Sequence, residues 1–371
     1  MGFTSIRTYQ FRNLADTEIP VDCRDVYLIG ENGQGKTNFI EAVYLLCYGT
    51  SFRTKIDRHL ISHEKTEMSV SGRYRLCGEE NIVSVSVTEK EKRIRLNGKQ
   101  VKDRKELIGS NPCILFSHDD MELVQGSPEK RRFFFNQTMT LVDTLFVDVL
   151  RSYSRLLKLR NCALKERQND LIDVYDEQIA TVGFEIQRRR SETVAEFNRT
   201  FSPLFGTVSG LSEGITIRYA PSLRDATDAR SVCDELKKRR EVDIAFGTTT
   251  AGPHRDRFSF LLGRRNFTEL ASTGQIRLTA LALKAAQGMF FREKTGRNPI
   301  LLLDDVLLEL DRRKREAFLS LLPAYEQAFY TFLPNEEIVN TAFSTETNEL
   351  PLQYRVHHGS CEVIWKKQEI S

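Results

Sequence analysis

Residues 30–37 read Gly30-Glu31-Asn32-Gly33-Gln34-Gly35-Lys36-Thr37 and fit the pattern G-x-x-x-x-G-K-[ST]. The glycines let the backbone turn tightly, so that successive N–H groups point at phosphate oxygens. A helix after the loop would present its positive N-terminal end to the same anion. The pattern also places Lys36 within reach of the β- and γ-phosphates and the Thr37 hydroxyl on Mg²⁺. We therefore expect all eight residues to contribute to an ATP site.

The segments on both sides of this loop support that expectation. Val26-Tyr27-Leu28-Ile29 is an apolar run of the length of a buried strand, and residues 38–48 carry apolar side chains at helical spacing. A chance glycine-rich turn is the alternative, but such a turn would usually lack this context. The order strand, loop, helix therefore predicts a P-loop.

A second apolar segment, residues 299–303, ends in Asp304-Asp305. Taken alone, it could be a core strand followed by an acidic turn. Paired with the phosphate loop, it predicts a Walker B strand, whose terminal carboxylate positions Mg²⁺. Asp304 would then hold the metal, and Asp305 would orient or deprotonate the attacking water. We expect Lys36 and Asp305 to be the catalytic residues, and Thr37 and Asp304 the metal ligands.

About thirty residues before that strand lies Ser272-Thr273-Gly274-Gln275, at the start of a long apolar helix. It resembles the ABC signature, a Ser–Gly turn at a helix N-terminus that contacts the γ-phosphate bound by the other subunit. An ordinary Ser-capped helix is the alternative. The position between the two Walker motifs favours the signature, with Ser272, Gly274 and Gln275 contacting the partner's ATP. Residues 308–311, Leu-Glu-Leu-Asp, fit a D-loop.

The secondary structure that the sequence predicts changes along the chain. From about residue 117 to 210 strand patterns fade, and helical patterns dominate over 140–165 and 171–201. Strand patterns return at 215–219 and 258–262. This order predicts an α/β protein: an ABC-type ATPase head with a mixed sheet, plus an inserted all-helical lobe. We expect an ATPase lobe in 1–116 and 211–371 and a helical lobe in 117–210.

The bulk composition favours a globular protein without a membrane segment. The 371 residues are 40% hydrophobic and 28% charged, and no apolar run approaches the ~20 residues that span a bilayer. Seven scattered cysteines without a Cys-x-x-Cys pair argue against a zinc site or disulfides and for a cytoplasmic protein. Because the net charge is only +3, nucleic-acid binding must rest on local clusters.

Together these motifs resemble the RecF family of ABC/SMC-type ATPases. Residues 30–38 match its phosphate loop, G-x-N-G-x-G-K-T-N, and 49–54 match Gly-x-Ser-Phe-Arg-Thr. Further matches lie at 126–132, 159–161 and 252–256. The resemblance implies a weak, Mg²⁺-dependent ATPase that dimerises on ATP and binds DNA at single-strand gaps and junctions. It also implies work with RecR and RecO in directing RecA during recombinational repair.

Three positions depart from the family pattern. Thr273 replaces a glutamine of the signature, Leu308 replaces a D-loop serine, and Phe134-Phe135-Asn136 replaces Phe-Leu-Asp. None of these changes removes a phosphate or metal ligand. Loss of the D-loop hydroxyl leaves the detail of cross-subunit signalling open.

One local cluster favours DNA binding. On a helix, Arg151, Arg155 and Lys158 fall on one face within about 80 degrees of each other, and Arg131 and Arg132 precede them. Such a stripe can neutralise phosphates without reading sequence. A solvated helix face is the alternative. Other basic positions could line the nucleotide or DNA side of the ATPase lobe: Arg12, Arg53, His254 and Arg255. The role of residues 252–256 stays open.

Three other functions compete with this interpretation. Transporter ATPase subunits usually have a histidine 25–35 residues after Walker B, but residues 325–340 contain none and carry Thr331. An SMC-like chromosome protein would need a long coiled coil, which residues 117–210 are too few to form. A non-hydrolysing ATP binder is compatible with Asp305, which stands where ABC proteins usually have glutamate.

Overall fold

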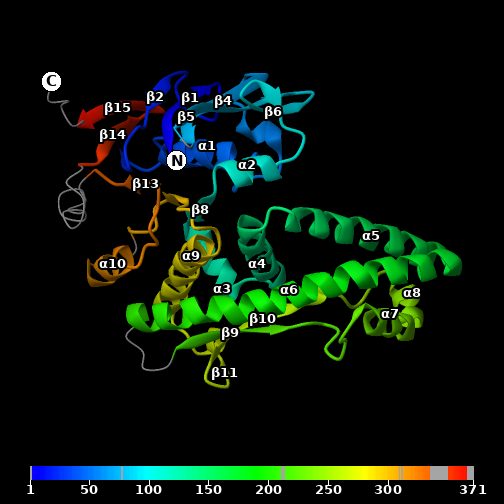
Figure 1. The fold of residues 1–371 in the computed structure, drawn as a ribbon. Coiled ribbons are helices and arrows are strands. Elements are labelled where there is room, and N and C mark those ends of the chain that lie inside the picture. The colour runs from blue at the N-terminus through cyan, green and yellow to red at the C-terminus, as the bar shows by residue number, and fades with distance from the viewer. Residues whose placement is uncertain are drawn as a thin grey trace. The chain divides into compact units, whose positions relative to one another are not determined.

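The computed structural model describes residues 2–76, 78–209, 214–308, 310, 312–334 and 350–365. The chain forms two compact units, coloured by residue number in Figure 1. The first unit comprises Met1–His118 and Phe291–Ser371, and the second comprises Asp119–Phe290. This division corrects the predicted boundary at residue 210. Residues 214–290 belong to the second unit because strands β9 (Ile215–Ala220) and β10 (Arg257–Leu262) pack on its helices α6 (Asn169–Ser209) and α4 (Pro128–Val142).

The first unit contains a six-stranded antiparallel sheet in the order β2-β1-β4-β5-β6-β7. Its strands are β1 (Phe3–Tyr9), β2 (Glu18–Pro20), β4 (Glu67–Leu76), β5 (Glu79–Thr88), β6 (Lys92–Leu96) and β7 (Lys99–Gln100). Buried and exposed residues alternate along β4 and β5, as in a sheet with one covered face. Asn97 and Gly98 both have positive φ in the turn between β6 and β7, the conformation that an Asn-Gly pair favours in a two-residue hairpin.

A second six-stranded sheet of this unit carries the predicted nucleotide motifs. Its order is β15-β14-β3-β13-β12-β8, parallel except for the terminal β14–β15 pair. The strands are β3 (Asp25–Ile29), β8 (Cys113–Phe116), β12 (Ile300–Leu303), β13 (Gln327–Phe332), β14 (Leu352–His357) and β15 (Ser360–Trp365). Strands β3, β8, β12 and β13 are buried throughout, as expected of parallel strands covered on both faces.

Helix α1 (Lys36–Tyr48) follows β3 after the phosphate loop and buries Phe39, Ile40 and Val43. The unit also contains α2 (Lys105–Ser110), α10 (Arg312–Leu319) and the short 3-10 helix η1 (Asp57–Leu60), and the 3-10 helix η2 (His118–Asp120) spans the boundary to the second unit. Because β3, β12 and β13 are parallel neighbours in one sheet, their carboxyl ends lie at the same edge. The loops that follow these strands are therefore brought together, as in other open α/β sheets that bind ligands at this edge.

The second unit is built mainly of helices. These are α3 (Met121–Gln125), α4 (Pro128–Val142), α5 (Phe146–Glu166), α6 (Asn169–Ser209), α7 (Ala229–Lys238), α8 (Arg240–Phe246) and most of α9 (Thr273–Thr295), with 3-10 helices η3 (Pro253–Arg255) and η4 (Phe267–Glu269). Helices α5 and α6 pack side by side as a long hairpin (Figure 1). The single helix predicted over 140–165 is interrupted at Asp143, whose carboxylate accepts the Leu145 N–H.

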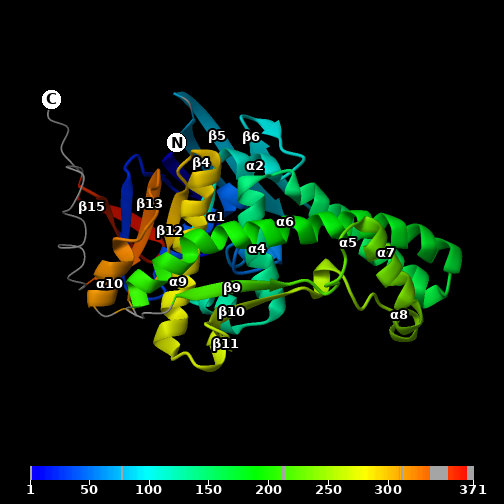
Figure 2. The ribbon, with the colours of Figure 1, turned by 60° about the horizontal axis from the view of Figure 1, so that its bottom comes forward.

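The second unit also contains a three-stranded antiparallel sheet, which comes from residues after the predicted helical lobe; in the described part of 117–210 every regular element is a helix, as predicted. The order of the sheet is β11 (Arg265–Asn266), β10 (Arg257–Leu262) and β9 (Ile215–Ala220), and it lies along α6 (Figure 2). Phenylalanines join the sheet to the helices: the ring of Phe135 on α4 stacks on Phe258 of β10 with centroids 4.3 Å apart. The α/β fold class is confirmed, with both sheets and helices in each unit.

Candidate nucleotide-binding site

The phosphate loop runs from the end of β3 to the start of α1, as predicted. A Cβ on Gly30 would lie 2.3 Å from the Val356 carbonyl oxygen, so no larger residue fits there. Gly33 and Gly35 have φ of 79° and 116°, in the region that favours glycine. Residues 31–33 are exposed. The loop therefore has the tight backbone turn and the solvent-accessible residues that phosphate binding requires.

Lys36 is only 4% exposed and lies over its own loop. Its Nζ donates to the Gly30 carbonyl at 2.6 Å and to the Glu31 carbonyl at 3.1 Å. An ammonium has three donors, so these bonds hold the group in position and leave one N–H for a phosphate oxygen. This placement fits the role predicted for Lys36.

Side chains from outside the motif fix the loop. Asn13 donates to the Gly33 carbonyl at 3.3 Å and accepts a bond from Asn38 at 2.6 Å. The Gln34 carbonyl and side-chain oxygens accept the N–H groups of Gly359 and His358, at 2.9 and 2.8 Å. The hairpin between β14 and β15 thus supports the loop from its other side, a contact that the motif alone could not reveal.

Thr37 and Asp304 meet at the start of α1, as predicted for two metal ligands. The Thr37 hydroxyl donates to Asp304 Oδ1 at 3.0 Å, although 267 positions separate the two residues in the chain. Mg²⁺ usually takes one or two protein ligands and keeps several waters. A hydroxyl and a carboxylate beside the phosphate loop therefore fit this ion. No cluster of three or more His, Cys, Asp or Glu side chains forms a further metal site within the described ranges.

Burial changes the acid–base behaviour of Asp304. The residue is 8% exposed, and its burial, together with the charge of Asp305, raises its pKa from 3.8 to about 7. The Thr37 hydrogen bond and the positive charges of Arg53 and Lys36 act in the opposite direction but are smaller effects. A divalent cation would favour the ionised carboxylate, so metal binding here is coupled to loss of a proton.

Asp305 is held by Thr331, near the end of the neighbouring strand β13. The Asp305 N–H donates to the Thr331 hydroxyl oxygen at 2.7 Å, and that hydroxyl lies 2.9 Å from Asp305 Oδ1, to which it donates. Asp305 has a positive φ of 54°, uncommon for a residue with a side chain. Thr331 thus fixes the carboxylate predicted to orient water. In the sequence, Thr331 stood out only as part of a stretch that lacks the histidine of transporter ATPases; the structure places it within β13.

A buried carboxylate behind the loop was missed from the sequence. Glu41 on α1 is fully buried and accepts two bonds from Arg12, at 3.0 and 2.9 Å. Arg53 contacts Glu41 at 3.4 Å and Asn38 at 2.7 Å. A buried charge requires such partners. Arg12 and Arg53 therefore do lie near the phosphate loop, bound to its helix. The available signal was a glutamate within the apolar pattern of residues 39–46.

The signature residues form the N-terminus of α9, in the second unit. Gln275 N–H donates to the Ser272 hydroxyl at 3.3 Å, and Ser272 N–H donates to the Gln275 side chain at 2.9 Å. This reciprocal pair is a capping box, so the ordinary capping role and the signature share the same residues. Ser272, Thr273 and Gly274 are exposed. Of the predicted D-loop, Leu308 and Leu310 are described, whereas Glu309 and Asp311 lie outside the described residues.

The predicted DNA residues fall into two groups. Arg131 donates to the carbonyls of Val124 and Phe258, at 2.6 and 3.1 Å, and Arg132 donates to the Asp256 carbonyl at 3.0 Å. Burial lowers the pKa of both guanidinium groups. The fold itself therefore uses some of the donors of Arg131 and Arg132, and a contact of these residues with DNA stays a prediction.

The rest of that prediction lies on α5. Its three residues, Arg151, Arg155 and Lys158, are all exposed, whereas Tyr153 is buried on the side facing the core. Arg151 also lies 3.5 Å from Asp148, one turn earlier. The helix face is therefore accessible, and only part of its charge is neutralised within the helix.

Residues 252–256 have a structural role in the second unit. Asp256 is fully buried and accepts bonds from Arg190 at 2.9 Å and from the Ser222 N–H at 2.8 Å. His254 contacts the Tyr153 hydroxyl at 2.7 Å, and burial lowers its pKa, which favours the neutral ring. Gly252 has φ of 128°, and a Cβ there would meet the Tyr153 hydroxyl at 2.6 Å. This segment thus joins α5, α6 and the sheet, and His254 and Arg255 do not belong to the ATPase unit.

Residues 159–161 are structural as well. Arg160 is fully buried and binds Asp176 at 2.6 Å, Asp243 at 2.7 Å and the Thr249 hydroxyl at 2.8 Å. Asn161 accepts both the N–H and the hydroxyl of Thr249. These bonds connect the α5–α6 hairpin to α8 and the following loop. Among the described helices, none is long and apolar enough to cross a membrane.

Comparison with known proteins agrees with this arrangement. The family model described as RecF/RecN/SMC N terminal domain matches residues 3–345. The DNA replication and repair protein RecF of Treponema pallidum (strain Nichols) is 41% identical over 354 residues, covering 95% of this chain and 98% of that protein. The protein of the same name from Leptospira interrogans is 31% identical over 326 residues, covering 86% and 88%.

Solved structures give the same result. The structure of a recombination mediator protein, RecF with ATP in the RecFOR pathway, is similar with a TM-score of 0.88 and 26% identity over 98% of this chain and 97% of that one. An SMC head bound to the C-winged helix domain of ScpA shares the fold, with a TM-score of 0.53 and 16% identity over 98% and 97%. The chain therefore belongs to the RecF family of ATPase-head proteins.

Proposed function

We propose that this chain is an ATP-dependent DNA-binding protein of recombinational repair, with weak ATPase activity. The observation that carries the proposal is the hydrogen bond of 3.0 Å between Thr37 on the phosphate-loop helix and Asp304 at the end of β12. It joins the two halves of a nucleotide site from distant parts of the sequence. Membership of the RecF family and the likeness to an ATP-bound relative support the same function.

In this proposal, the backbone N–H groups of residues 30–35 and Lys36 bind the ATP phosphates. The N-terminal end of α1 adds the favourable field of its dipole. Thr37 and Asp304 would hold Mg²⁺, which neutralises phosphate charge when bound. Asp304 must lose its proton to do so, because its pKa of about 7 leaves it partly protonated at neutral pH.

Hydrolysis is assigned to Asp305, through its free carboxylate oxygen. Oδ1 accepts the Thr331 hydroxyl, so Oδ2 is the oxygen left to orient or deprotonate the attacking water. Aspartate is shorter than the glutamate that ABC proteins usually carry here. Its carboxylate therefore stops short of the position that glutamate reaches, and we expect slow turnover. Thr331 is a positioning residue in this scheme.

The capped N-terminus of α9 supports a dimer that closes on ATP. Its signature residues, Ser272, Gly274 and Gln275, place the exposed Gly274 backbone and a positive dipole end toward an anion, while the N–H groups of Ser272 and Gln275 are engaged in the capping box. A second protomer's γ-phosphate is that anion in the proposal. Closure on ATP would clamp DNA and hydrolysis would release it. The proposed partners are RecR and RecO, in keeping with the RecFOR pathway named for the structural relative. Directing RecA to single-strand gaps is part of the same proposal and rests on the family resemblance.

Two neighbouring aspartates test the division of roles. Asp305→Asn should slow hydrolysis and leave ATP binding intact, because the metal ligand and the phosphate loop are unchanged. Asp304→Asn should weaken Mg²⁺-dependent ATP binding itself. Titrations with labelled ATP and single-turnover hydrolysis separate the two effects. Equal behaviour of the two variants would contradict the assignment.

The exposed residues of α5 are the proposed DNA contact in the second unit. Replacing Arg151, Arg155 and Lys158 by glutamine should weaken binding to every DNA sequence, because backbone contacts carry no sequence information. The dependence of log affinity on log salt should flatten by up to about 0.9 for each duplex phosphate that the variant no longer neutralises. ATP binding should stay normal. An unchanged salt dependence would remove DNA from this helix.

A further inference from the structure

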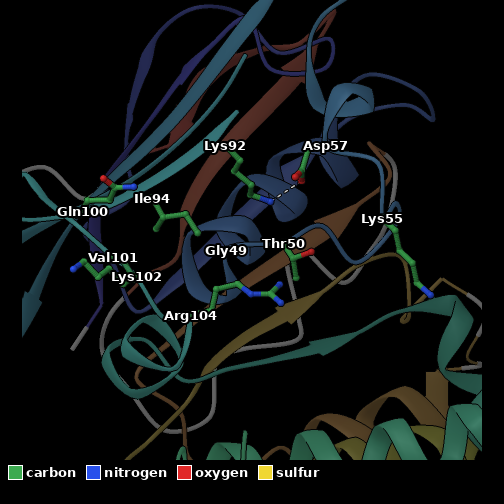
Figure 3. Close-up of a pocket in the computed structure, with 10 residues that line it drawn as sticks. All are labelled: Gly49, Thr50, Lys55, Asp57, Lys92, Ile94, Gln100, Val101, Lys102 and Arg104. Atoms are coloured by element: carbon green, nitrogen blue, oxygen red, sulfur yellow. Dashed lines mark hydrogen bonds and ion pairs between the residues drawn. The ribbon is translucent and has the colours of Figure 1, made fainter. Parts of the chain in front are cut away.

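The first unit has a cleft of about 340 Å³ that none of the nucleotide motifs explains. We call it the cationic cleft. Four basic side chains line it, namely Lys55, Lys92, Lys102 and Arg104, against one acid, Asp57. Figure 3 shows Lys92 facing Asp57 across the cleft, with Arg104 reaching below Thr50. The cleft lies between helix α1, the β6–β7 hairpin and the segments 50–57 and 101–104.

Three of these cations are free to bind a ligand. Lys92 is paired with Asp57 at 2.6 Å. In the described part of the chain, no ion pair involves Lys55, Lys102 or Arg104, and all three residues are exposed. One ion pair and three unneutralised cations leave the cleft with a local charge of +3.

The sequence around the cleft is the most basic part of this unit's antiparallel sheet. Residues 90–105 contain eight Lys or Arg against two Asp or Glu, a net charge of +6 within a chain whose total is +3. Strands β6 and β7, which carry Lys92, Arg93, Arg95 and Lys99, form one edge of that sheet. A concentration of one sign of charge in a concave surface attracts polyanions and raises their association rate.

The lining also defines the kind of anion. Its apolar side chains are Ile94 and Val101, and the lining contains no aromatic residue on which a base could stack. Small-molecule sites are mostly apolar, whereas binding of a nucleic-acid backbone depends on Lys and Arg near phosphates. The cleft is therefore suited to a charged backbone and provides neither the apolar surface for a small ligand nor a platform for a base.

One feature of the fold opposes an anion here, but it is weak. Gly49, which lines the cleft, is the C-cap of α1, and the carboxyl end of a helix carries a partial charge of about −0.5. Three unpaired cations outweigh that half charge. Gly49 also has φ of 64°, and a Cβ there would lie 2.7 Å from the Ile94 side chain. Glycine therefore lets the floor of the cleft form at this position.

We infer that the cationic cleft binds the sugar–phosphate backbone of DNA, as a contact on the ATPase unit separate from the α5 residues. The inference rests on the proposed DNA-binding function and names a second surface for it. Helix α1 begins at the phosphate loop and ends at this cleft. The Gly49–Thr54 segment leads from the cleft to Arg53, which is bound to Glu41 and Asn38 of the same helix. DNA at the cleft thus contacts the helix that binds the nucleotide.

The test compares two triple variants of the full chain that remove equal charge from the same unit. The cleft variant is Lys55→Gln, Lys102→Gln and Arg104→Gln. The control variant is Lys65→Gln, Arg73→Gln and Arg75→Gln, three exposed residues outside the cleft lining. Affinity for duplex and gapped DNA of two unrelated sequences is measured over a series of salt concentrations. ATP titration and thermal unfolding check that both variants keep the fold and the nucleotide site.

The cleft variant should bind both sequences more weakly, and to the same extent. Its salt dependence should flatten by up to about 0.9 for each duplex phosphate that is no longer neutralised, whereas the control variant should keep the wild-type slope. Matching slopes in the two variants would overturn the inference while leaving the proposed function intact. Wild-type protein that binds no DNA at all would instead contradict the proposed function.

A chemical footprint gives an independent readout. Acetylation of Lys55 and Lys102, followed by mass spectrometry, should fall when DNA is added, while acetylation of Lys65 should not change. Polyglutamate at an equal concentration of charge should give little protection, because it lacks the regular phosphate spacing and stiffness of DNA. Equal protection by polyglutamate, or none by DNA, would overturn the assignment to nucleic acid.

Discussion

The protonation of Asp304 gives a quantitative prediction about nucleotide binding. With a pKa of about 7, the carboxylate is about nine-tenths ionised at pH 8 and only about one-tenth ionised at pH 6. Because Mg²⁺ needs the ionised form, Mg²⁺-dependent ATP affinity should fall about tenfold between these pH values, which is ~1.4 kcal/mol. An aspartate at its ordinary pKa of 3.8 would remain ionised across this range and contribute no change.

The assay is calorimetric titration of the wild-type protein and of Asp304→Asn with Mg²⁺-ATP, from pH 6 to pH 8. The terminal phosphate of ATP also titrates in this range, since phosphate monoesters have a second pKa of about 6. Asp304→Asn shares that background and lacks the carboxylate. The difference between the two proteins therefore isolates Asp304. Repeating the titration in buffers of different ionisation enthalpy measures the protons released.

Parallel behaviour of the two proteins would refute this coupling. If the wild-type and Asp304→Asn affinities change in parallel with pH, and no proton release depends on the carboxylate, Asp304 is ionised throughout. Its burial and the charge of Asp305 would then fail to raise its pKa, and the coupling between metal binding and proton loss would be wrong.

The same pKa has a consequence for stability, with the opposite sign from an ordinary salt-bridged aspartate. A carboxyl whose pKa rises on folding stabilises the folded state at low pH, and that contribution is lost as pH rises through the folded pKa. A change from 3.8 to about 7 corresponds to at most about 4 kcal/mol. Without metal and nucleotide, the free energy of unfolding should therefore fall relative to Asp304→Asn between pH 4 and 7.

Two further substitutions test other parts of the structure. Thr331→Val should slow ATP hydrolysis roughly tenfold or more without weakening ATP binding, because it removes one hydrogen bond to the Asp305 carboxylate. Thr331→Ser keeps the hydroxyl and should restore the rate of hydrolysis. A Thr331→Val variant with the wild-type rate would show that Thr331 does not position Asp305. Arg160→Met should reduce the free energy of unfolding in urea by about 3–5 kcal/mol, because it removes the buried cation that two buried aspartates share. Arg188→Met is the matched control, because it breaks only exposed ion pairs and should lower the free energy of unfolding by less than about 1 kcal/mol. An equal loss of unfolding free energy in both variants would contradict the structural role of Arg160.

The parts of the fold that the sequence predicted are those set by local pattern. The apolar run at residues 26–29, the glycine turn and the helix that begins at Lys36 are fixed by residues next to one another in the chain. The same holds for the apolar segment that ends at Asp304. In these segments burial and turn geometry follow directly from residue type.

The parts that escaped prediction depend on contacts between distant residues. Residues 215–219 were recognised as a strand, but nothing local shows that this strand packs on α6 rather than in the ATPase unit. Arg131 and Arg132 look like DNA contacts in the sequence, and only the folded chain brings the carbonyls of Phe258 and Asp256 to them. Charge pattern indicates a basic residue, whereas tertiary structure decides whether its donors are still available.

The residues of the candidate site also divide into those set by a local motif and those set by contacts between distant residues. Lys36, Thr37 and Asp304 were predicted because the chemistry of phosphate and metal fixes their spacing in a motif. Thr331 and Glu41 were not, because a threonine in a strand and a glutamate in a helix are common residues. Their roles come from a neighbouring strand and from two arginines far away in sequence.

The central claim, that this chain uses ATP to close a dimer, is tested most directly by sedimentation velocity with and without ATP and Mg²⁺. The wild-type protein should sediment as a monomer without nucleotide and as a dimer with ATP, and gapped DNA should add mass only to the dimer. Lys36→Ala should stay monomeric under all conditions, because it loses the only side-chain cation that the motif places on the β- and γ-phosphates. Wild-type sedimentation that does not change with ATP, or an ATP-dependent dimer of Lys36→Ala, would contradict the account.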